Sequence, residues 1–219
     1  MKLLHTILNI LFPPKCVLCG KFLEKEETDL CRICREVPKV PSSRKRKPQF
    51  LDSFAAVWYY EKNPRKSILR YKFGGKRCYA PAYGRILAMK LQQEYPQGFD
   101  CLTWVPVSTI RRLTRGYDQV ELLAMAVCRE LDWKAMPLLK KIRHNPRQSG
   151  IPDEAQRKMN VLGAYRAVNM DQIQGKRILL LDDVLTTGAT IGECARVLRE
   201  AGAKEVHCAA MAVSRKYLK

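Results

Sequence analysis

Acidic residues are scarce in this sequence. Twenty-one aspartates and glutamates stand against 40 lysines and arginines, so the formal net charge is +19. This imbalance points to a polyanionic partner: a nucleic acid, an anionic membrane face or a phosphate-rich small molecule. The alternative is a basic protein whose charge serves no ligand. The 47% share of hydrophobic residues argues against a wholly disordered chain.

A long apolar run is also missing. Residues 1–12 are apolar, but the stretch is too short to cross a bilayer. It leads directly into Pro13 and Pro14, without the small-residue cleavage site of a secretory signal. Its apolar residues recur at helical spacing, so we expect a short docking helix, with a membrane-surface helix as the alternative. We therefore expect no transmembrane segment.

An even number of cysteines is lacking too. Nine is an odd number, and without a secretory signal it argues against a disulfide framework. We therefore expect a reducing compartment, the cytoplasm. Four cysteines form two C-x-x-C pairs, and the other five are most simply small core residues. These five are Cys78, Cys101, Cys128, Cys194 and Cys208.

The two cysteine pairs follow the pattern C-x2-C-x11-C-x2-C and comprise Cys16, Cys19, Cys31 and Cys34. Four thiolates in paired turns suit a tetrahedral Zn²⁺. Such a closed site is structural, and it stabilises a piece too small for its own core. Gly20 follows the first pair, where we expect it to relieve crowding around the sulfur atoms. A redox-active C-x-x-C pair is the alternative.

Residues 37–48 read VPKVPSSRKRKP, which is a linker by composition and a basic stripe by charge. We expect it to end an N-terminal part, residues 1–49, that holds the leading helix and the cysteine module. The main domain then covers residues 50–219.

The main domain alternates predicted strands with predicted helices, which is typical of a mostly parallel α/β sheet. The apolar run at residues 177–181 indicates a central strand buried on both faces. Other strands are predicted at residues 53–60, 101–107, 165–168 and 205–213. Helices are predicted from the Asn63-Pro64 pair and at residues 82–94, 117–131, 154–159 and 190–200, with a glycine turn at residues 71–77.

Residues 178–190 read ILLLDDVLTTGAT, and each part of this motif suits a sugar phosphate. Ligands of parallel sheets lie beyond the carboxyl ends of strands, and the N-terminus of a helix attracts phosphate. Asp182 and Asp183 can accept hydrogen bonds from sugar hydroxyls, and Gly188 lets the backbone approach closely. Three hydroxyl groups add donors: Thr186, Thr187 and Thr190.

Residues 104–119 read WVPVSTIRRLTRGYDQ, a predicted strand followed by a basic loop. Arginine suits phosphate because its planar fork pairs with two oxygens at once. A solvated basic loop is the alternative. The candidate phosphate ligands are Arg111, Arg112 and Arg115.

The motif at residues 178–190 resembles the phosphoribosyl-pyrophosphate (PRPP) motif of type I phosphoribosyltransferases at every position. The resemblance implies a phosphoribosyltransferase-like α/β fold with flanking helices, preceded by the four-cysteine zinc ribbon. It also implies that Asp182 and Asp183 are the catalytic pair that holds the ribose hydroxyls. Residues 186–190, Ala189 among them, would wrap the 5′-phosphate, while the arginine loop binds pyrophosphate with Mg²⁺.

Two further segments resemble the ComF family. Residues 104–119 look like its VP-x…R-x-x-RG-[FY]-[ND]-Q signature, with Asp118 where asparagine is usual. Residues 141–160 are similar to its R…Q…R…N pattern, although Asn145 and Pro146 replace an expected threonine-containing stretch. This segment implies a flexible lid that excludes water, in which His144 is more simply a bystander than a catalyst. The matching positions are Arg143, Gln148, Arg157 and Asn160.

The order of these features is similar to that of ComF/ComFC-type competence proteins of bacteria. Membership implies a role in natural transformation and DNA uptake, with single-stranded DNA, a helicase and a recombination mediator as partners. We expect DNA to contact the basic linker at Arg44, Lys45, Arg46 and Lys47.

Two functions stay open at this point. One is a DNA-binding protein that retains a PRPP site, and the other is a Mg²⁺-dependent phosphoribosyltransferase acting on an unknown acceptor. No nucleobase pocket can be recognised. Residues 53–94 are a candidate for a small hood domain that selects an acceptor. Its aromatic residues Tyr71, Phe73 and Tyr79 are read either as stacking surfaces or as core.

Overall fold

The computed structural model describes residues 13–41, 49–143 and 159–218. The predicted leading helix, the basic linker residues Arg44, Lys45, Arg46 and Lys47, and most of the predicted lid lie outside the described residues.

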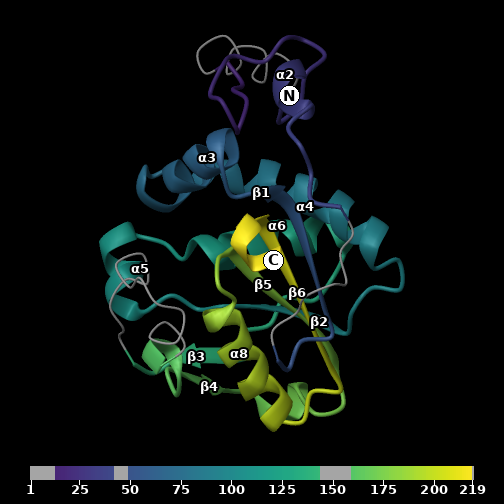
Figure 1. The fold of residues 1–219 in the computed structure, drawn as a ribbon, viewed down its shortest axis with the longest axis vertical. Helices are drawn as coiled ribbons and strands as arrows, with labels where there is room; N and C mark the ends of the chain where they lie inside the picture. Colours follow the sequence, from purple (N-terminus) through teal and green to yellow (C-terminus); the bar gives the residue numbers. More distant parts are fainter. Residues whose placement is uncertain (1–12, 42–48, 144–158, 219) are drawn as a thin grey trace, which may run out of the picture.

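Four parallel strands form the central sheet in the order β1-β6-β5-β2 (Figure 1). Its two middle strands are buried on both faces, because helices cover the sheet on either side. The parallel α/β fold predicted from the sequence is therefore confirmed. The strands are β1 (Ser53–Tyr59), β2 (Cys101–Trp104), β5 (Arg177–Leu185) and β6 (Glu205–Val213).

Two apolar layers sandwich this sheet, and alternate residues of β5 enter each of them. Leu179 and Leu181 join the core under α4 and α6, whereas Ile178 and Leu180 join the core under α8. Helices α4 and α6 pack closely: a Cβ on Gly84 would lie 2.6 Å from that of Ala126. The helices are α3 (Lys62–Phe73), α4 (Ala80–Glu94), α6 (Gln119–Leu131) and α8 (Ala189–Glu200).

The predicted basic loop after residue 107 is wrong, because most of it forms the short helix α5 (Thr109–Arg115). The side chain of Ser108 caps its first turn by accepting a hydrogen bond from the backbone N–H of Arg111. Gly116 ends it with φ at 74°, a left-handed conformation that favours glycine. These capping residues place the arginines on a helix rather than on an irregular segment.

Other element boundaries also differ from the prediction. Strand β5 continues through both aspartates to Leu185, instead of ending before them. Helix α3 takes Glu61 as its N-cap rather than Asn63, and it extends into the predicted turn at residues 71–77 as far as Phe73. Two short antiparallel strands, β3 (Leu139–Lys141) and β4 (Tyr165–Ala167), form a separate ribbon, and β4 contacts α8.

The predicted hood over residues 53–94 is wrong. Strand β1 lies in the main sheet with its inner five residues buried, and α4 packs on α6 as part of the same core. Tyr71 is fully buried in that core, and Tyr79 packs edge-on against Tyr83. Phe73 is 54% exposed, so it alone of the three aromatic candidates presents a large surface.

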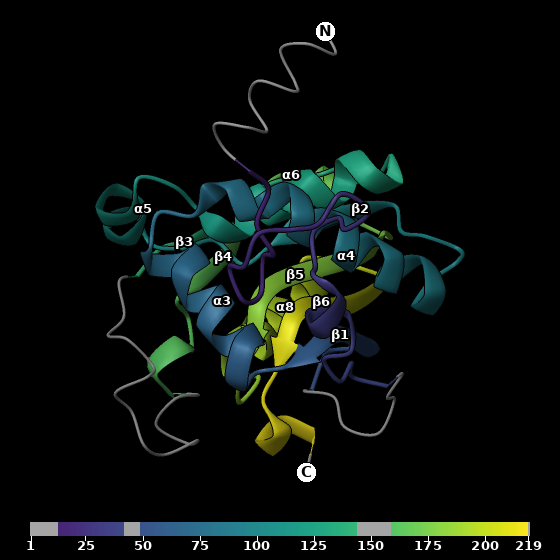
Figure 2. The same ribbon diagram turned by 90° about the horizontal axis from the view of Figure 1, so that it is seen from above.

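The cysteine module packs on α3 and α4 rather than standing apart (Figures 1 and 2). Its short helix α2 (Arg32–Arg35) follows the third cysteine. Val17 and Leu18 are buried in the core of the main domain, and Ser67 of α3 donates a hydrogen bond to the carbonyl of Val17. Among the described helices, none combines the length and apolar character that a membrane span requires.

Candidate functional site

The sulfur atoms of Cys16, Cys19, Cys31 and Cys34 all lie within 4.8 Å of one another. The Sγ atoms of Cys19 and Cys31 are 3.6 Å apart. A tetrahedral zinc with Zn–S bonds of about 2.3 Å places its sulfurs about 3.8 Å apart, so the four thiols fit the ion. Burial acts to raise the pKa of Cys16, but backbone hydrogen bonds outweigh it and lower that pKa to about 7. Burial instead raises the pKa of Cys19 and of Cys34 in the same cluster, so the fit to the ion rests on the distances between the sulfur atoms.

Gly20 has a different role from the expected one. A Cβ at this position would meet no atom within 4 Å, so crowding does not require glycine there. The backbone conformation of Gly20, with φ at +80°, favours glycine, because residues with a side chain rarely adopt it.

A cavity of about 450 Å³ opens beyond the carboxyl ends of β5 and β2. Of the predicted ligand residues, Thr187 and Arg112 do not line it. The structure thus brings together two sequence segments that were predicted separately. The predicted residues that line the cavity are Arg111, Arg115, Asp182, Asp183, Thr186, Gly188, Ala189 and Thr190.

Asp183 is held by side chains from two helices. Its Oδ1 pairs with Nζ of Lys72 on α3 at 2.7 Å, and its Oδ2 accepts a hydrogen bond from Nε2 of Gln119 on α6 at 2.9 Å. The Oε1 of Gln119 in turn accepts from Arg115 at 2.7 Å. Although Asp183 is only 5% exposed, both of its carboxylate oxygens therefore have partners.

Asp182 has a different environment from its neighbour. Its Oδ1 accepts a hydrogen bond from the backbone N–H of Asp183 at 2.8 Å. Burial, reinforced by the charge of Asp183, raises the pKa of Asp182 to about 8, although Lys72 acts in the opposite direction. The two adjacent acids are thus chemically distinct, as perturbed carboxyls at functional sites often are.

The turn after β5 leads into the N-terminus of α8. Gly188 is its N-cap, with φ at 78°, and the helix begins at Ala189. The hydroxyl of Thr187 accepts a hydrogen bond from the backbone N–H of Ala189 at 3.4 Å, so it serves the turn itself. The positive end of the α8 dipole lies at the cavity, where it favours an anion.

The arginines of α5 divide into two groups. Arg111 and Arg115 line the cavity, and the guanidinium of Arg115 stacks 4.7 Å from the centre of the Phe73 ring. Arg112 has a side chain that is 63% exposed and lies 3.7 Å from a carboxylate oxygen of Glu121, away from the cavity. One helix therefore presents cations both to the cavity and to solvent.

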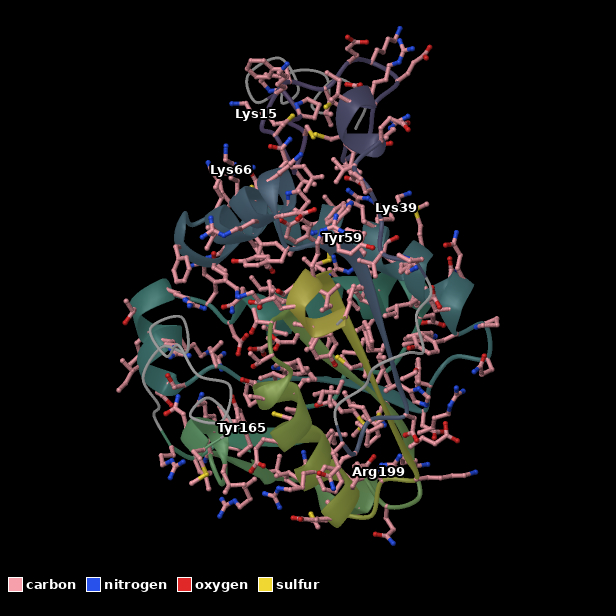
Figure 3. The ribbon with its side chains drawn as sticks, in the orientation of Figure 1. Lys15, Lys39, Tyr59, Lys66, Tyr165 and Arg199 are labelled. Carbon is pink, nitrogen blue, oxygen red and sulfur yellow. The ribbon has the colours of Figure 1, made fainter. Side chains whose placement is uncertain are left out.

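Two cavity lysines were not predicted from the sequence. Besides Lys72, these include Lys141 of β3, which donates a hydrogen bond to the hydroxyl of Tyr165 on β4 at 3.2 Å and lies over its ring; Tyr165 is labelled in Figure 3. Burial, and secondarily the charge of Arg111, lowers the pKa of Lys141 to about 8. The only sequence signal for Lys72 is its place in the basic stretch YKFGGKR, which does not indicate where its side chain points.

Asp118, where the ComF signature usually has asparagine, is the N-cap of α6. Its carboxylate accepts hydrogen bonds from the backbone N–H groups of Val120, Glu121 and Val107 at 2.9 to 3.1 Å. Aspartate and asparagine are both good N-caps. The departure from the usual residue therefore preserves this structural role.

Comparison with known families matches this architecture. The family described as "Phosphoribosyl transferase domain" matches residues 121–218, and the "Double zinc ribbon domain" family matches residues 7–44. The chain therefore joins a phosphoribosyltransferase-type domain to an N-terminal zinc ribbon, with a structural zinc at the four cysteines.

Three curated proteins are similar to this chain over most of its length. Competence protein F of Haemophilus influenzae is 27% identical, over 88% of this chain and 93% of its own length. Competence protein ComFC of Streptococcus pneumoniae is 30% identical, over 70% of this chain and 65% of its own length. The DNA utilization protein YhgH of Salmonella typhimurium is 28% identical, over 87% and 86%. Over most of its length, the chain is similar to ComF/ComFC-type competence proteins.

Proposed function

We propose that this protein binds PRPP, or a related ribose phosphate, in its cavity and binds single-stranded DNA during natural transformation. The observation that carries the proposal is the convergence of Asp182 and Asp183 with the N-terminus of α8 and with three cationic side chains from α5 and β3. These cations are Arg111, Arg115 and Lys141.

The cavity combines acceptors and donors in the arrangement that a ribose phosphate needs. Carboxylates accept hydrogen bonds from the ribose hydroxyls, while Gly188 and the hydroxyls of Thr186 and Thr190 lie at a helix N-terminus that attracts the 5′-phosphate. The arginines of α5 suit a pyrophosphate group. Mg²⁺ would enter with the phosphates of PRPP, since this ion is usually held by substrate phosphates together with few protein ligands.

DNA binding is supported by charge and by the names of the relatives. A net charge of +19 favours a polyanion, and the relatives are named for competence and for DNA utilization. Exposed cations outside the cavity lining include Arg77 of the η1 segment (Arg77–Tyr79), which donates a hydrogen bond to the carbonyl of Gly116 at the end of α5, and Arg112 of α5 itself. The linker cations predicted to contact DNA lie outside the described residues. A helicase and a recombination mediator are partners that this role would require.

The cytoplasm is the compartment that we propose. None of the nine cysteines, all of which lie in described residues, forms a disulfide: four make up the zinc cluster, four more are buried in the core, and Cys78 is exposed rather than the core residue that was expected. Free thiols persist where the cellular redox buffer is reducing.

An active Mg²⁺-dependent phosphoribosyltransferase is the second candidate. It is favoured by the α3 side of the cavity, which adds residues that a ribose phosphate does not need. The residues that line this side, and that we propose for contact with an acceptor, are Tyr60, Arg65, Leu69 and Phe73. Their mixture of rings and a guanidinium does not select one acceptor class.

A competition experiment distinguishes the two functions. A labelled single-stranded oligonucleotide is titrated with the protein by fluorescence anisotropy, and PRPP with Mg²⁺ is then added. A protein that uses its phosphate site for DNA releases the oligonucleotide, whereas an enzyme that binds DNA elsewhere does not. Pyrophosphate release with candidate acceptors measures turnover directly. If the protein shows no salt-sensitive DNA binding, the DNA proposal fails and the transferase becomes the better account.

A further inference from the structure

Lys72 contacts Asp183, although it lies in none of the sequence segments from which the site was predicted. It lies in the last turn of α3, a helix whose other end follows β1, yet its Nζ is 2.7 Å from Oδ1 of Asp183 on β5. The side chains are 20% and 6% exposed, respectively. An ion pair this buried costs desolvation on both sides, so its presence needs an explanation beyond a surface contact.

Among the other cations on α3, Arg65 also lines the cavity, but Lys66 and Arg70 do not. Lys66 of the same helix is exposed and points outward from the molecule, as Figure 3 shows. Arg70 contacts the zinc ribbon instead. Burial alone would lower the pKa of Lys72, but the charge of Asp183 outweighs it and raises that pKa, which keeps the ammonium charged at neutral pH.

Lys72 and Gln119 together hold the carboxylate of Asp183 from two sides. Lys72 holds one oxygen of Asp183 and Gln119 holds the other, so the plane of the carboxylate is fixed from two helices. A site that must recognise two vicinal hydroxyls needs such a fixed acceptor, because small errors of orientation weaken directional hydrogen bonds.

We propose that Lys72 is a positioning residue of the cavity, which orients Asp183 through the 2.7 Å ion pair so that this carboxylate meets a ribose hydroxyl. This inference rests on the proposed ribose-phosphate function. It assigns to α3 a part in ligand recognition, although α3 carries none of the predicted motifs.

The charge of Lys72 also acts on Asp182, because it opposes the rise in the pKa of that group. Removing the ammonium is therefore expected to raise the pKa of Asp182 above about 8. The titratable groups that interact with Asp182 come from six elements: Asp183 of β5, Lys72 of α3, Lys141 of β3, Tyr165 of β4, Cys194 of α8 and Cys208 of β6.

The test is a double-mutant cycle on the full chain. The affinity for PRPP with Mg²⁺ is measured by titration calorimetry for the parent, Lys72→Met, Asp183→Asn and the double variant, from pH 7 to pH 9. Lys72→Arg tests rescue by a second cation, and Lys66→Met is the matched control on the same helix. Titration of PRPP itself is common to all variants and cancels in the ratios of their affinities.

We expect Lys72→Met to weaken binding by about tenfold or more in the parent and by less than about twofold in the Asp183→Asn background, because its effect passes through Asp183. Lys72→Arg restores most of the affinity, and Lys66→Met leaves it unchanged. The ratio of parent to Lys72→Met affinity should change between pH 7 and pH 9, whereas a purely structural contact leaves it constant.

Equal losses in both backgrounds would mean that Lys72 touches the ligand directly, and no loss would mean that it has no part in recognition; either result overturns the proposal. If the parent does not bind PRPP, the proposed function fails, and the same cycle is measured on thermal melting without ligand. Non-additive melting temperatures then support the orienting pair, and additive ones contradict it.

Discussion

Arg70 donates a hydrogen bond from its guanidinium to the backbone carbonyl of Leu18 at 2.6 Å, which joins helix α3 to the zinc ribbon. Two residues further along the same helix, Lys72 pairs with Asp183 in the cavity. One helix therefore contacts both the metal module and the candidate binding site. The ribbon is part of the structure that supports the cavity, rather than an independent appendage.

Zinc removal should therefore destabilise the whole chain. Elemental analysis should find one zinc per chain, lost in Cys16→Ser and in Cys31→Ser. Because Val17 and Leu18 share the core of the main domain, the melting temperature should fall by at least about 5 °C. Cys78→Ser, at an exposed cysteine outside the cluster, is the control and should change neither value. A zinc-free chain that melts at the parent temperature would refute the structural role of the ion.

The raised pKa of Asp182 predicts a pH-dependent stability. Its pKa is about 8 in the folded chain against an ordinary value of 3.8, so the folded state binds this proton more tightly. Stability is therefore lost as the pH rises from about 4 to about 8. Asp182→Asn removes the ionisation, and its advantage in melting temperature over the parent should widen from pH 5 to pH 8. A difference that stays constant over this range would contradict the assignment.

Substitutions of two arginines on helix α5 should affect PRPP binding and DNA binding differently. Arg115→Ala removes a cavity cation and should weaken PRPP binding about tenfold or more, the scale of a charge-assisted hydrogen bond. Arg112→Ala should leave PRPP affinity unchanged and lower DNA affinity, because its side chain is exposed. Calorimetry and anisotropy measure the two affinities in parallel. Equal PRPP losses in both variants would show that α5 contributes only its overall charge.

The basic linker should contribute to DNA binding alone. Neutralising Arg44, Lys45, Arg46 and Lys47 together should weaken binding to single-stranded DNA and reduce the slope of log affinity against log salt by about 3. Affinity for PRPP should not change, because these residues lie outside the sequence motifs that predict the cavity. An unaltered salt slope would move the DNA contacts to other cations, such as those of α5.

Much of the fold and part of the candidate site could be predicted from local sequence patterns. The spacing of the cysteines and the apolar run before Asp182 are local signals, and the residues that they single out lie together in the structure. Residues 53–94 were misassigned because an apolar strand pattern does not say which sheet the strand joins. Strand β1 pairs with β6, at the other end of the chain.

The rest of the site depends on contacts between segments that are far apart in the sequence. Lys72 and Lys141 reach the cavity from α3 and β3, which are far from β5 in the sequence, and no periodicity in the sequence records that arrangement. Helix α5 was missed for a different reason. Its cap residues, Ser108 and Gly116, bound a segment of only seven residues, which is too short for an apolar periodicity to show.

The binding of PRPP itself tests the central claim most directly. Titration calorimetry with PRPP and Mg²⁺ is carried out on the parent and on the variant with both Asp182→Ala and Asp183→Ala, with circular dichroism confirming that the variant is folded. We predict one PRPP bound per parent chain and no measurable binding by the folded double variant. Absence of binding by the parent, or equal affinity in the variant, would contradict the assignment of the cavity as a ribose-phosphate site.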